Sequence, residues 1–354
     1  MKHRLCYISR CYHDLVLAGN KAKTDSEATL DSLGAVNLGL PQKVNGNKVG
    51  AFFYNLAGVV RYLFTVRRGD IVLLQYPVKK YFTLICRVAH HRGARVVALV
   101  HDLGSMRRRK LTVAQELRRL EHADGVIATN EVMEQWLIDQ GLKVAFTDHM
   151  GLWDYLSPAQ SPVATTEETP SSTSSAISPR PTIIAYAGNL KERKASWLRQ
   201  WPEGGHPYVI HVFGHSELEG LTARQDLQVM GSAAPETFIS RCGCDLGLVW
   251  DGHSIDTCTG NFGEYLRYNT PHKVSFYLRA GLPVVVWRQS AMAHIVEQEG
   301  IGITIDRLAD LDRLLPLPPE ELARLRSNVA RVGQRIAQGD YLREVVGRAM
   351  QRLS

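Results

Sequence analysis

The sequence has no uninterrupted apolar run of the ~18 residues that a bilayer-spanning helix requires, anywhere in its 354 residues. The nearest segment, 49–66, is interrupted by Asn55 and Arg61. We therefore predict no transmembrane helix and interpret 49–66 as a core-facing helix; a helix lying on a membrane surface is the alternative. No long apolar stretch follows the first residues, so we also expect no signal peptide.

Paired cysteine motifs are missing as well. None of the six cysteines forms a Cys-x-x-Cys pair, and the spacing of Cys242 and Cys244 is one residue short of it. This pattern excludes the usual zinc ribbons and favours reduced thiols in a cytoplasmic protein. Peripheral association with the inner face of the membrane is compatible with that expectation.

Several nucleotide and metal motifs are absent. There is no Gly-x-x-x-x-Gly-Lys-[Ser/Thr] and no well-placed Gly-x-Gly-x-x-Gly, so ATPase and dehydrogenase functions are disfavoured. The one Asp-x-Asp, Asp310-Leu-Asp312, does not follow a strand. We therefore predict no metal and no cofactor, and expect helix termini and cationic side chains to hold any leaving diphosphate.

The composition is that of an ordinary globular protein with a modest basic excess. The chain is 45% hydrophobic and carries a formal net charge of +7. A basic excess suits a nucleic acid, an anionic membrane or the diphosphate of a nucleotide sugar. No aromatic-basic interleaving or known nucleic-acid module is present, so a nucleic-acid partner is not expected.

Short β-branched runs alternate with amphipathic stretches throughout the first half. This alternation predicts a parallel sheet covered by helices on both faces. The expected strands are 5–9, 71–75, 95–100, 125–129 and 143–147, and the helices between them lie near 26–33, 51–66, 81–91, 112–121 and 131–140.

The composition changes abruptly at 157–181, which is almost wholly Ser, Thr, Pro, Ala and Glu and reads as a linker or long loop. The alternation then resumes. We predict an N-terminal Rossmann-like acceptor domain over 1–156 and a C-terminal Rossmann-like nucleotide-sugar domain over 182–354, with a cleft between them. The expected strands of the second domain are 182–187, 208–213, 245–250, 283–287 and 302–305, followed by helices at 319–337 and 341–353.

The richest polar stretch follows the buried strand that ends at Asp251, and we expect Asp251 itself to contact the nucleotide sugar. Open parallel sheets bind ligands beyond the carboxyl ends of their strands. Pro271 suits the first turn of a helix, which leaves backbone N–H groups directed at an anion, and Lys273 adds a point charge. Asn269 can bond a phosphate or ribose oxygen, and Glu264 can accept from sugar hydroxyls. The alternative is a capped helix with solvated charges.

Two further turns of the second half are candidates. Gly188 and Asn189 end a strand, where glycine lets a phosphate or sugar approach the backbone, and Lys194 follows closely. Gly231 opens a loop before a short helix and could cradle a uracil. Ordinary strand-to-helix turns remain the alternative for both.

The first half offers a general base. Asp102 ends a buried strand and could take the proton of a sugar hydroxyl, whereas its neighbour His101 could equally be a core histidine. Asn20 is expected in a loop after the first strand, where it would face the cleft and contact the nucleotide sugar. Trp153 and Tyr155 are interpreted mainly as packing residues, with stacking on an acceptor sugar as the alternative.

These residues fall within longer recognisable strings. Outside 157–181 the sequence resembles the bacterial β-1,6-galactofuranosyltransferases of surface-polysaccharide gene clusters, and is similar to the glucosyltransferase that extends GlcNAc on serine-rich streptococcal adhesins. The strings are AGNKAKTD (18–25), QYP (75–77), HDL (101–103), WDY (153–155), YAGNL (186–190), GNFGEYLRYNTPHK (260–273) and VGQRIAQGDY (332–341).

The resemblance implies a GT-B fold, a UDP-sugar donor, no metal and a homo-oligomer. By motif it places Tyr268, Asn269, His272 and Lys273 on the diphosphate or ribose. It makes Lys194 a basic donor contact, although the turn before it is two residues longer than the family pattern, which leaves Arg193 and Lys194 hard to separate.

The function implied is transfer of a hexosyl residue, galactofuranose or glucose, from a UDP-sugar to a hydroxyl of a glycan or lipid-linked glycan. The alternative is a catalytically inactive, sugar-binding partner subunit of a glycosyltransferase complex.

Overall fold

The structure is a computed structural model that describes residues 3–12, 18–78, 81–162, 180–215, 218 and 221–353. Its contacts divide the chain into two compact units. Unit 1 comprises Met1–Leu156, Tyr268–His272 and Gln338–Ser354, and unit 2 comprises Ser157–Arg267 and Lys273–Ala337. Two segments that the sequence assigns to the second domain by chain order are thus grouped with unit 1.

Unit 1 is built on a six-stranded parallel sheet in which the strand order reverses beside β1. One of its inner strands, β5, is buried along its whole length, as expected for a parallel strand covered on both faces, and residues 71–74 are all apolar. In spatial order the strands are β3 (Val36–Asn37), β1 (Arg4–Tyr7), β5 (Asp70–Tyr76), β6 (Arg95–Val100), β7 (Gly125–Ala128) and β8 (Phe146–His149). A two-stranded sheet, β2 (Cys11–Tyr12) with β4 (Lys43–Val44), follows the end of β1.

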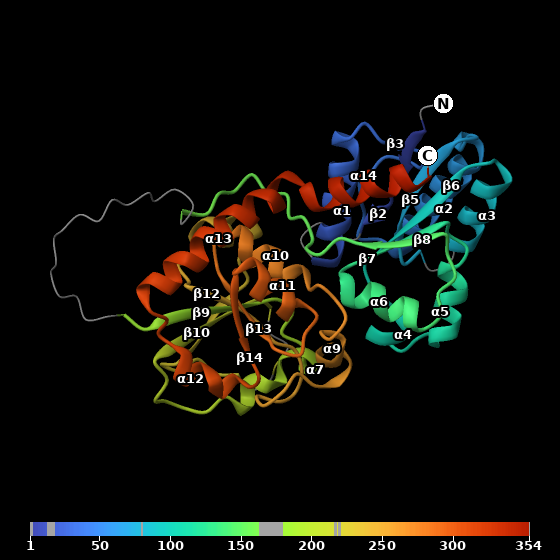
Figure 1. The fold of residues 1–354 in the computed structure, drawn as a ribbon. Coiled ribbons are helices and arrows are strands. Elements are labelled where there is room, and N and C mark those ends of the chain that lie inside the picture. Colours follow the sequence, from blue (N-terminus) through green and yellow to red (C-terminus); the bar gives the residue numbers. More distant parts are fainter. Residues whose placement is uncertain are drawn as a thin grey trace. The chain divides into compact units, whose positions relative to one another are not determined.

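Helices connect these strands, and the last helix of the chain packs with them. Helix α14 contacts α1 and β8 and lies along unit 1 (Figure 1). The helices are α1 (Ala18–Ser32), α2 (Lys48–Thr65), α3 (Phe82–His91), α4 (Gly104–Arg107), α5 (Val113–Leu120), α6 (Glu131–Asp139) and α14 (Asp340–Leu353). None of the helices in the described ranges combines the length and apolar composition that a bilayer crossing requires.

The start of α1 corrects one expectation. Asn20 was expected in a loop, but it lies in the first turn of α1, which begins eight residues before the predicted helix. The helical pattern was hidden because polar residues of α1 are buried, among them Asp25, Ser26 and Glu27. Their side chains are satisfied inside the unit, for example by the hydrogen bond from Ser9 Oγ to Glu27 at 2.5 Å.

Unit 2 repeats the parallel architecture with a different strand order. Its sheet reads β11 (Leu227–Gly231), β10 (Tyr208–Phe213), β9 (Thr182–Ala187), β12 (Leu246–Val249), β13 (Val284–Trp287) and β14 (Gly302–Ile305). Strand β11 was not predicted, because three of its five residues are exposed and it shows no apolar run. The order of unit 2 reverses between β9 and β12.

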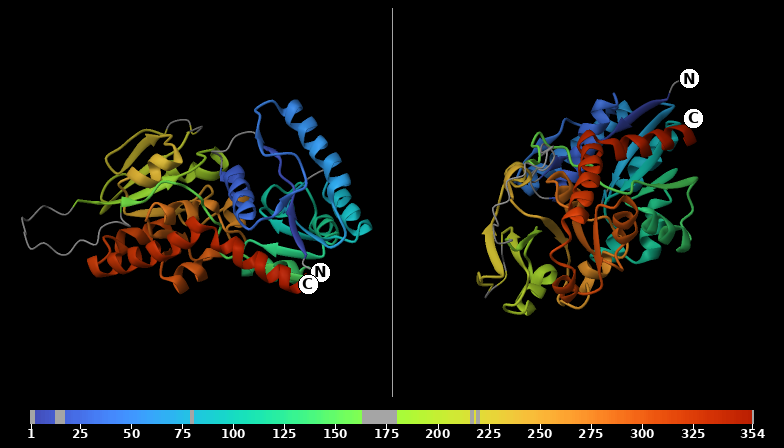
Figure 2. Two further views of the ribbon diagram at one scale, coloured as in Figure 1. Left: turned by 90° about the horizontal axis from the view of Figure 1, so that it is seen from above. Right: turned by 60° about the vertical axis from the view of Figure 1, so that its left-hand side comes forward.

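Helices follow most of the strands of unit 2, as parallel pairing requires a crossover between neighbouring strands. They are α7 (Glu192–Ala195), the 3-10 helix η2 (Ser196–Gln200), α8 (Pro235–Arg241), α9 (Gly260–Tyr265), α10 (His272–Arg279), α11 (Met292–Glu299), η3 (Leu308–Asp310), α12 (Leu311–Leu314) and α13 (Pro319–Gln338). Helices α10, α11 and α13 can be followed beside the strands in both further views (Figure 2).

The return of the chain end to unit 1 has a local cause. Gly339 has a φ of +78° and separates α13 from α14. A Cβ at this position would lie 2.6 Å from Thr29 Oγ1 of α1, so only glycine allows the approach. The carboxylate of Asp154 then accepts hydrogen bonds from the backbone N–H groups of Tyr341 and Leu342, at 3.2 and 2.9 Å, and caps α14.

Candidate functional site

The first candidate site lies in unit 2, at the carboxyl ends of β9 and β12, where the strand order reverses. Such a reversal is the place where open parallel sheets bind their ligands. The chain leaving β9 reaches α7, and the chain leaving β12 continues into Asp251. The two loops are joined directly, because the backbone N–H of Gly252 donates to the carbonyl of Lys194 at 2.7 Å.

Three charged side chains meet at this point and form an ion cluster: Lys194, Asp251 and Lys273. The ammonium groups of Lys194 and Lys273 each lie 3.1 Å from a different oxygen of the Asp251 carboxylate. The carboxylate is 6% exposed, against 20% and 15% for the two lysine side chains. Burial opposes ionisation of Asp251, but the two lysines outweigh it and hold its pKa below the ordinary value.

Aromatic rings support both ammonium groups. The Nζ atom of Lys273 lies 4.8 Å from the ring centre of Tyr186, and that of Lys194 lies 5.0 Å from the ring of Phe262. Such contacts stabilise a cation and restrict its position. These contacts also distinguish the two basic residues of the turn. Arg193 is exposed and stacks on Phe262 at 5.0 Å, whereas Lys194 belongs to the ion cluster.

Gly263, in the same string as Phe262, allows α9 to approach the cluster. A Cβ on Gly263 would lie 2.6 Å from the carbonyl oxygen of Asp251 and 2.6 Å from the backbone of Cys258. A larger residue would therefore push α9, and with it Phe262, away from Asp251. The GNFGEY string thus fixes the surroundings of the ion cluster rather than supplying a charged contact of its own.

Three glycines end neighbouring strands of unit 2. The N–H of Gly188 donates to the carbonyl of Phe213 at 3.0 Å, and the N–H of Gly214 donates to the carbonyl of Gly231 at 2.9 Å. Gly188 and Asn189 are exposed, and Gly231 is half-buried. Gly214 was missed from the sequence. Its φ is +145°, and a Cβ added at this position would lie only 2.0 Å from the carbonyl oxygen of Gly188, so the position requires glycine.

Glu264 lies apart from these features in its contacts. It is an exposed residue of α9, and its carboxylate pairs with Arg267 at 3.2 Å. Arg267 in turn stacks over Trp287 at 4.4 Å. These contacts agree with the alternative left open by the sequence, in which Glu264 is a solvated charge of a capped helix.

The segment Tyr268–His272 is held by contacts inside unit 1. The side-chain amide of Asn130 donates to the carbonyl of Tyr268 and to the Thr270 hydroxyl, both at 3.0 Å. The indole N–H of Trp153 donates to the carbonyl of Thr270 at 3.1 Å. Trp153 is buried, which agrees with the packing interpretation of the WDY string.

His272 is a neutral histidine in this segment. Its Nε2 donates to the carbonyl of Asp154 at 3.3 Å, and its ring stacks on Tyr155 with 5.0 Å between centres. Burial lowers the pKa of His272 to about 3, so the ring carries no charge near neutral pH. Because Nε2 carries the proton, Nδ1 is an acceptor, and within the described residues it has no partner.

Asn269 shares this property. Its side-chain oxygen is buried and has no hydrogen-bond partner among the described residues. A buried acceptor without a donor costs free energy unless a ligand or water supplies one. Asn269 Oδ1 and His272 Nδ1 therefore suit hydroxyl donors, whereas a phosphate oxygen offers neither of them a proton.

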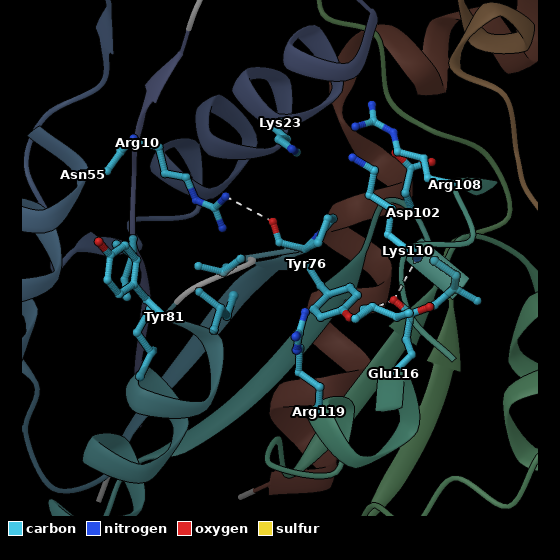
Figure 3. A pocket seen from close by; sticks show the side chains of 18 of the residues that line it. Arg10, Lys23, Asn55, Tyr76, Tyr81, Asp102, Arg108, Lys110, Glu116 and Arg119 are labelled. Carbon is cyan, nitrogen blue, oxygen red and sulfur yellow. Dashed lines mark hydrogen bonds between the residues drawn. The ribbon is translucent and has the colours of Figure 1, made fainter. Parts of the chain in front are cut away.

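The second candidate site is a cavity of about 770 Å³ in unit 1. It lies beyond the carboxyl ends of β1, β5 and β6, and so at the reversal of strand order in this sheet (Figure 3). Asp102, the expected general base, lines the cavity and pairs with the guanidinium of Arg107. The basic residues of the lining outnumber the acidic ones, and they are Arg10, Lys23, Arg107, Arg108, Lys110 and Arg119.

Glu116, the other acidic residue of the lining, is occupied structurally. Its carboxylate accepts from the N–H groups of Gly104 and Ser105, at 2.9 and 2.7 Å, and from the Tyr76 hydroxyl at 2.8 Å. It therefore holds α4 in place. Within the described part of the chain no backbone N–H donates to the Asp102 carboxylate, and 31% of its side chain is exposed.

Arg10 was missed from the sequence because it directly follows the expected strand 5–9 and belongs to no recognisable motif. Its guanidinium donates to the carbonyls of Gln75 and Pro77, at 2.9 and 3.3 Å, and it lines the cavity (Figure 3). Burial lowers the pKa of Arg10, which shows that the cation is held at an electrostatic cost. Two carbonyls use only part of its donor capacity.

His101 next to Asp102 has the structural role that the sequence left open. Its Nε2 lies 2.8 Å from Gln75 Oε1, and its ring stacks on Trp153 with 4.4 Å between centres. Burial lowers its pKa well below the ordinary value, so the ring is neutral. His101 therefore supports the packing around Asp102.

Among the described residues, no group of three His, Cys, Asp or Glu side chains is placed to hold a metal ion. In the one Asp-x-Asp string, Asp310 accepts from the N–H groups of Asp306 and Arg307 at 3.0 and 3.1 Å, and Asp312 bonds His206 at 2.6 Å. Metal-independent chemistry stays a prediction.

Comparisons with known proteins agree over both units. Residues 5–149 match the family model described as glucosyltransferase 3-like, N-terminal domain, and residues 184–349 match the corresponding C-terminal domain. The β-1,6-galactofuranosyltransferase WbbI of Escherichia coli K12 is 27% identical over 93% of this chain and 93% of its own length. Glucosyltransferase 3 of Streptococcus gordonii is 22% identical over 80% of this chain and 79% of its own.

Solved structures show the same architecture. HepE of Anabaena, in complex with UDP, aligns over 98% of this chain and all of its own, with a TM-score of 0.59 and 13% identity. A glycosyltransferase of Rickettsia africae aligns over 99% of this chain and 98% of its own, with a TM-score of 0.58 and 9% identity. The two parallel-sheet units therefore have the GT-B arrangement of glycosyltransferases.

Proposed function

Because this chain belongs to the glucosyltransferase 3-like family and is a GT-B glycosyltransferase, we propose that it transfers a hexosyl residue from a UDP-sugar to a hydroxyl of a glycan or lipid-linked glycan. Galactofuranose and glucose are the candidate sugars, since the relatives are named for their transfer. The observation that carries the proposal is the ion cluster of Lys194, Asp251 and Lys273 at the strand reversal of unit 2.

Hexosyl transfer requires a group that stabilises the departing diphosphate. The bond between the anomeric carbon and the diphosphate oxygen breaks, the carbon acquires oxocarbenium character, and a bond to the acceptor oxygen forms. UDP leaves with additional negative charge, and the acceptor hydroxyl loses a proton. Lys194 and Lys273 supply two positive charges and Asp251 one negative charge, so the cluster has a net positive charge already in place when the diphosphate departs.

Asp251 takes a different part from the one expected for it. As a buried carboxylate it would repel a diphosphate, so we assign it to positioning the two lysines rather than to direct contact with UDP. Gly188 and Asn189 follow β9, next to the cluster, and Gly231 ends β11, two strands away in the same sheet; the glycines leave the backbone open to a ligand.

Asn269 and His272 are proposed to accept hydrogen bonds from hydroxyls of the ribose or of the donor sugar. Both have an unpartnered buried acceptor, and His272 is neutral. Tyr268 places this segment through its carbonyl bond to Asn130. The proposal leaves out Asn20 and Glu264, which the sequence suggested as donor contacts.

The acceptor is proposed to enter the cavity of unit 1. Asp102 would take the acceptor proton, with Arg107 holding its carboxylate in place. The basic lining would favour acceptors that carry negative charge, as the phosphate of a lipid-linked glycan does.

The test is UDP binding and turnover by Lys273→Ala. Lys194 remains to pair with Asp251, so the variant should fold. Loss of one cation at the leaving group should lower kcat/KM by roughly a hundredfold to a thousandfold. The melting-temperature rise that UDP produces in the wild type should shrink. Donor hydrolysis over a panel of UDP-sugars identifies the sugar, and EDTA should leave the rate unchanged.

Arg241→Ala, which removes an exposed cation of α8 in the same unit, is the matched control and should retain wild-type turnover. Wild-type rates in Lys273→Ala would refute the assignment of the cluster. If the wild-type chain binds a UDP-sugar but never releases UDP with any acceptor, the catalytically inactive partner subunit becomes the better description.

A further inference from the structure

The positive charge of this chain is concentrated in one stretch. Residues 32–101 contain ten Lys and Arg and a single acidic residue, Asp70, a net charge of +9, whereas the whole chain carries +7. The other residues together therefore carry −2. Asp70 is buried and pairs with Arg4 at 2.7 Å, so it offers no exposed carboxylate.

Helix α2 lies in this stretch and turns an apolar side to solvent. Val49, Phe53, Val60 and Phe64 are 64%, 61%, 46% and 79% exposed. Their spacing of four, seven and four residues places them on one side of a helix. The buried residues of α2 are only Gly58, Val59 and Tyr62. The core-facing helix expected from the sequence thus buries a narrow strip that includes Tyr62, and it exposes two phenylalanines and two valines.

The opposite side of α2 is firmly held, so this exposure does not come from a frayed helix. The Asn47 side chain caps the first turn by accepting from the N–H groups of Val49 and Gly50. Asn55 Oδ1 accepts from the N–H of Cys11 at 2.8 Å, and the Tyr62 hydroxyl donates to the carbonyl of Ile85 at 3.0 Å. The helix runs along the outside of unit 1 (Figure 2, left).

Helix α3 continues the same surface. The guanidinium of Arg92 donates to the carbonyl of Leu63 at 3.4 Å, which places the end of α3 beside α2. On α3, Leu84 is 45% exposed and Arg87 is exposed. We call the apolar residues Val49, Phe53, Val60, Phe64 and Leu84, with the exposed cations Lys48, Arg61 and Arg87, the α2–α3 face.

We propose that the α2–α3 face docks on an anionic phospholipid surface. Aromatic and aliphatic side chains on one side of a helix insert at the level of the headgroups, and lysines and arginines around them are attracted to anionic lipids. This face has both features and no exposed acidic residue of its own. A nucleic acid would use the cations but leave Phe53 and Phe64 in water.

Charge also argues against a second copy of the chain as the occupant. A two-fold interface places the same patch on both partners. It would bring the +9 stretch of one chain against the +9 stretch of the other. An anionic bilayer instead complements the charge and accepts the apolar side chains.

The face and the unit 1 cavity share helix α2. Phe52 and Val59 of α2 line the cavity that also contains Asp102. If the acceptor is lipid-linked, which rests on the proposed function, docking would bring the headgroup region to the mouth of the acceptor site. The docking itself requires no substrate and is measured without one.

The test is flotation of the full-length protein with vesicles. Two compositions are compared: pure phosphatidylcholine, and an equal mixture of phosphatidylcholine and phosphatidylglycerol. The wild type should float with the mixed vesicles and remain below the neutral ones, and its binding should weaken with added salt.

Two variants divide the face into its apolar and charged parts. Phe53→Ser with Phe64→Ser should weaken binding at least about tenfold, because two aromatic insertions are lost. Lys48→Gln with Arg61→Gln and Arg87→Gln should weaken it about a hundredfold, from the contribution of each cation at an anionic surface. All five side chains are exposed, so folding should be retained.

Matched controls come from other helices. Val132→Ser with Ile138→Ser on α6 removes two exposed apolar residues from another helix of unit 1, at 40% and 44% exposure. Arg313→Gln with Arg324→Gln and Arg331→Gln removes three exposed cations of unit 2. Both controls should bind mixed vesicles as the wild type does.

The proposal is overturned if the wild type fails to float with the mixed vesicles, or if the face variants bind as the controls do. It is also overturned if sedimentation shows self-association that Phe53→Ser with Phe64→Ser abolishes while vesicle binding is unchanged. UDP should stabilise every variant equally, so a failure of the docking proposal is distinguishable from a failure of the donor site.

Discussion

In unit 2 the strand ends at the reversal of strand order carry a closed ion cluster, whereas the corresponding ends in unit 1 surround an open cavity. Asp251 is held between two lysines at 3.1 Å, with aromatic rings beneath both ammonium groups. Asp102 has one guanidinium partner and borders a space of about 770 Å³. A reversal of strand order in a parallel sheet thus supports a preset charge arrangement in one unit and a cavity that accommodates a ligand in the other.

The difference follows from what each unit is proposed to bind. A diphosphate is the same in every UDP-sugar, so a rigid arrangement of charge can be built for it in advance. A glycan acceptor is larger and presents many hydroxyls, so a roomy cavity with one carboxylate and several distributed cations suits it better. The excess charge of the chain lies in unit 1 for the same reason, together with the α2–α3 face.

The largest expected effect tests the open cavity. Asp102→Asn removes the proposed general base, and transfer should fall by about a hundredfold to ten-thousandfold. The partly exposed pair with Arg107 contributes little stability, of order 1 kcal/mol or less. Steady-state transfer and the UDP-induced change in melting temperature are the two measurements, and the second should not change.

Glu131→Gln, an exposed carboxylate of α6 in the same unit, is the control for Asp102→Asn. If Asp102→Asn transfers sugar at the rate of this control, the base lies elsewhere and the cavity has lost its catalytic assignment. If UDP binding falls together with transfer, the assignment of the donor to unit 2 and of the acceptor to the cavity of unit 1 is wrong.

The next effect tests the closed cluster. Asp251→Asn leaves two ammonium groups facing each other without their carboxylate. Breaking a buried ion pair typically costs about 3–5 kcal/mol, and we expect the lower end because the lysines are partly exposed. Urea denaturation should show this loss, whereas UDP should still raise the melting temperature, because both cations remain.

The control for Asp251→Asn is Glu297→Gln, which breaks the exposed pair with Arg288 and should change stability by less than about 1 kcal/mol. Equal stability of the two variants would mean that the lysines do not depend on Asp251 for compensation. Asp251 would then not be what holds the two lysines in place, and the contrast between a rigid cluster in unit 2 and an open cavity in unit 1 would be lost.

The sequence allowed much of this architecture to be predicted, because the strands are buried apolar runs. β6, β9, β10 and β14 were predicted with their observed limits, and the GT-B fold is confirmed by the comparisons. Lys194, Asp251 and Lys273 were each named as candidates from the sequence. That the three side chains lie within contact distance of one another depends on the strand order, which no local sequence pattern encodes.

What was missed has physical causes too. Arg10 directly follows an expected strand and belongs to no recognisable motif, and only the packed cavity reveals its spare donors. The start of α1 was hidden by buried polar residues that find partners in other elements. The return of α14 to unit 1 depends on the fit of Gly339 against Thr29 and on the carboxylate of Asp154, and Thr29 and Asp154 are both distant in sequence from α14.

The smallest effect near neutral pH concerns His272 and Lys273, neighbours in sequence that fall in different units and differ in charge. Burial lowers the pKa of His272 to about 3, below the unfolded value near 6.5. Between these values the unfolded chain takes up a proton that the folded chain refuses. Stability should therefore fall as pH drops below about 6.5, with a slope of up to about 1.4 kcal/mol per pH unit from this residue.

Other groups around His272 titrate over the same range, so the effect is read as a difference between two proteins. Burial raises the pKa of Asp154 to about 7 and that of Asp25 to about 6, and both oppose the trend by favouring the folded state as pH falls. His272→Asn, which keeps an acceptor, should have a flatter rise of stability from pH 4 to pH 6.5. If the free energy of unfolding depends on pH in the same way in the wild type and the variant, His272 takes up its proton as readily in the folded chain as in the unfolded one. His272 would then not be held neutral, and its contrast with the charged Lys273 would be lost.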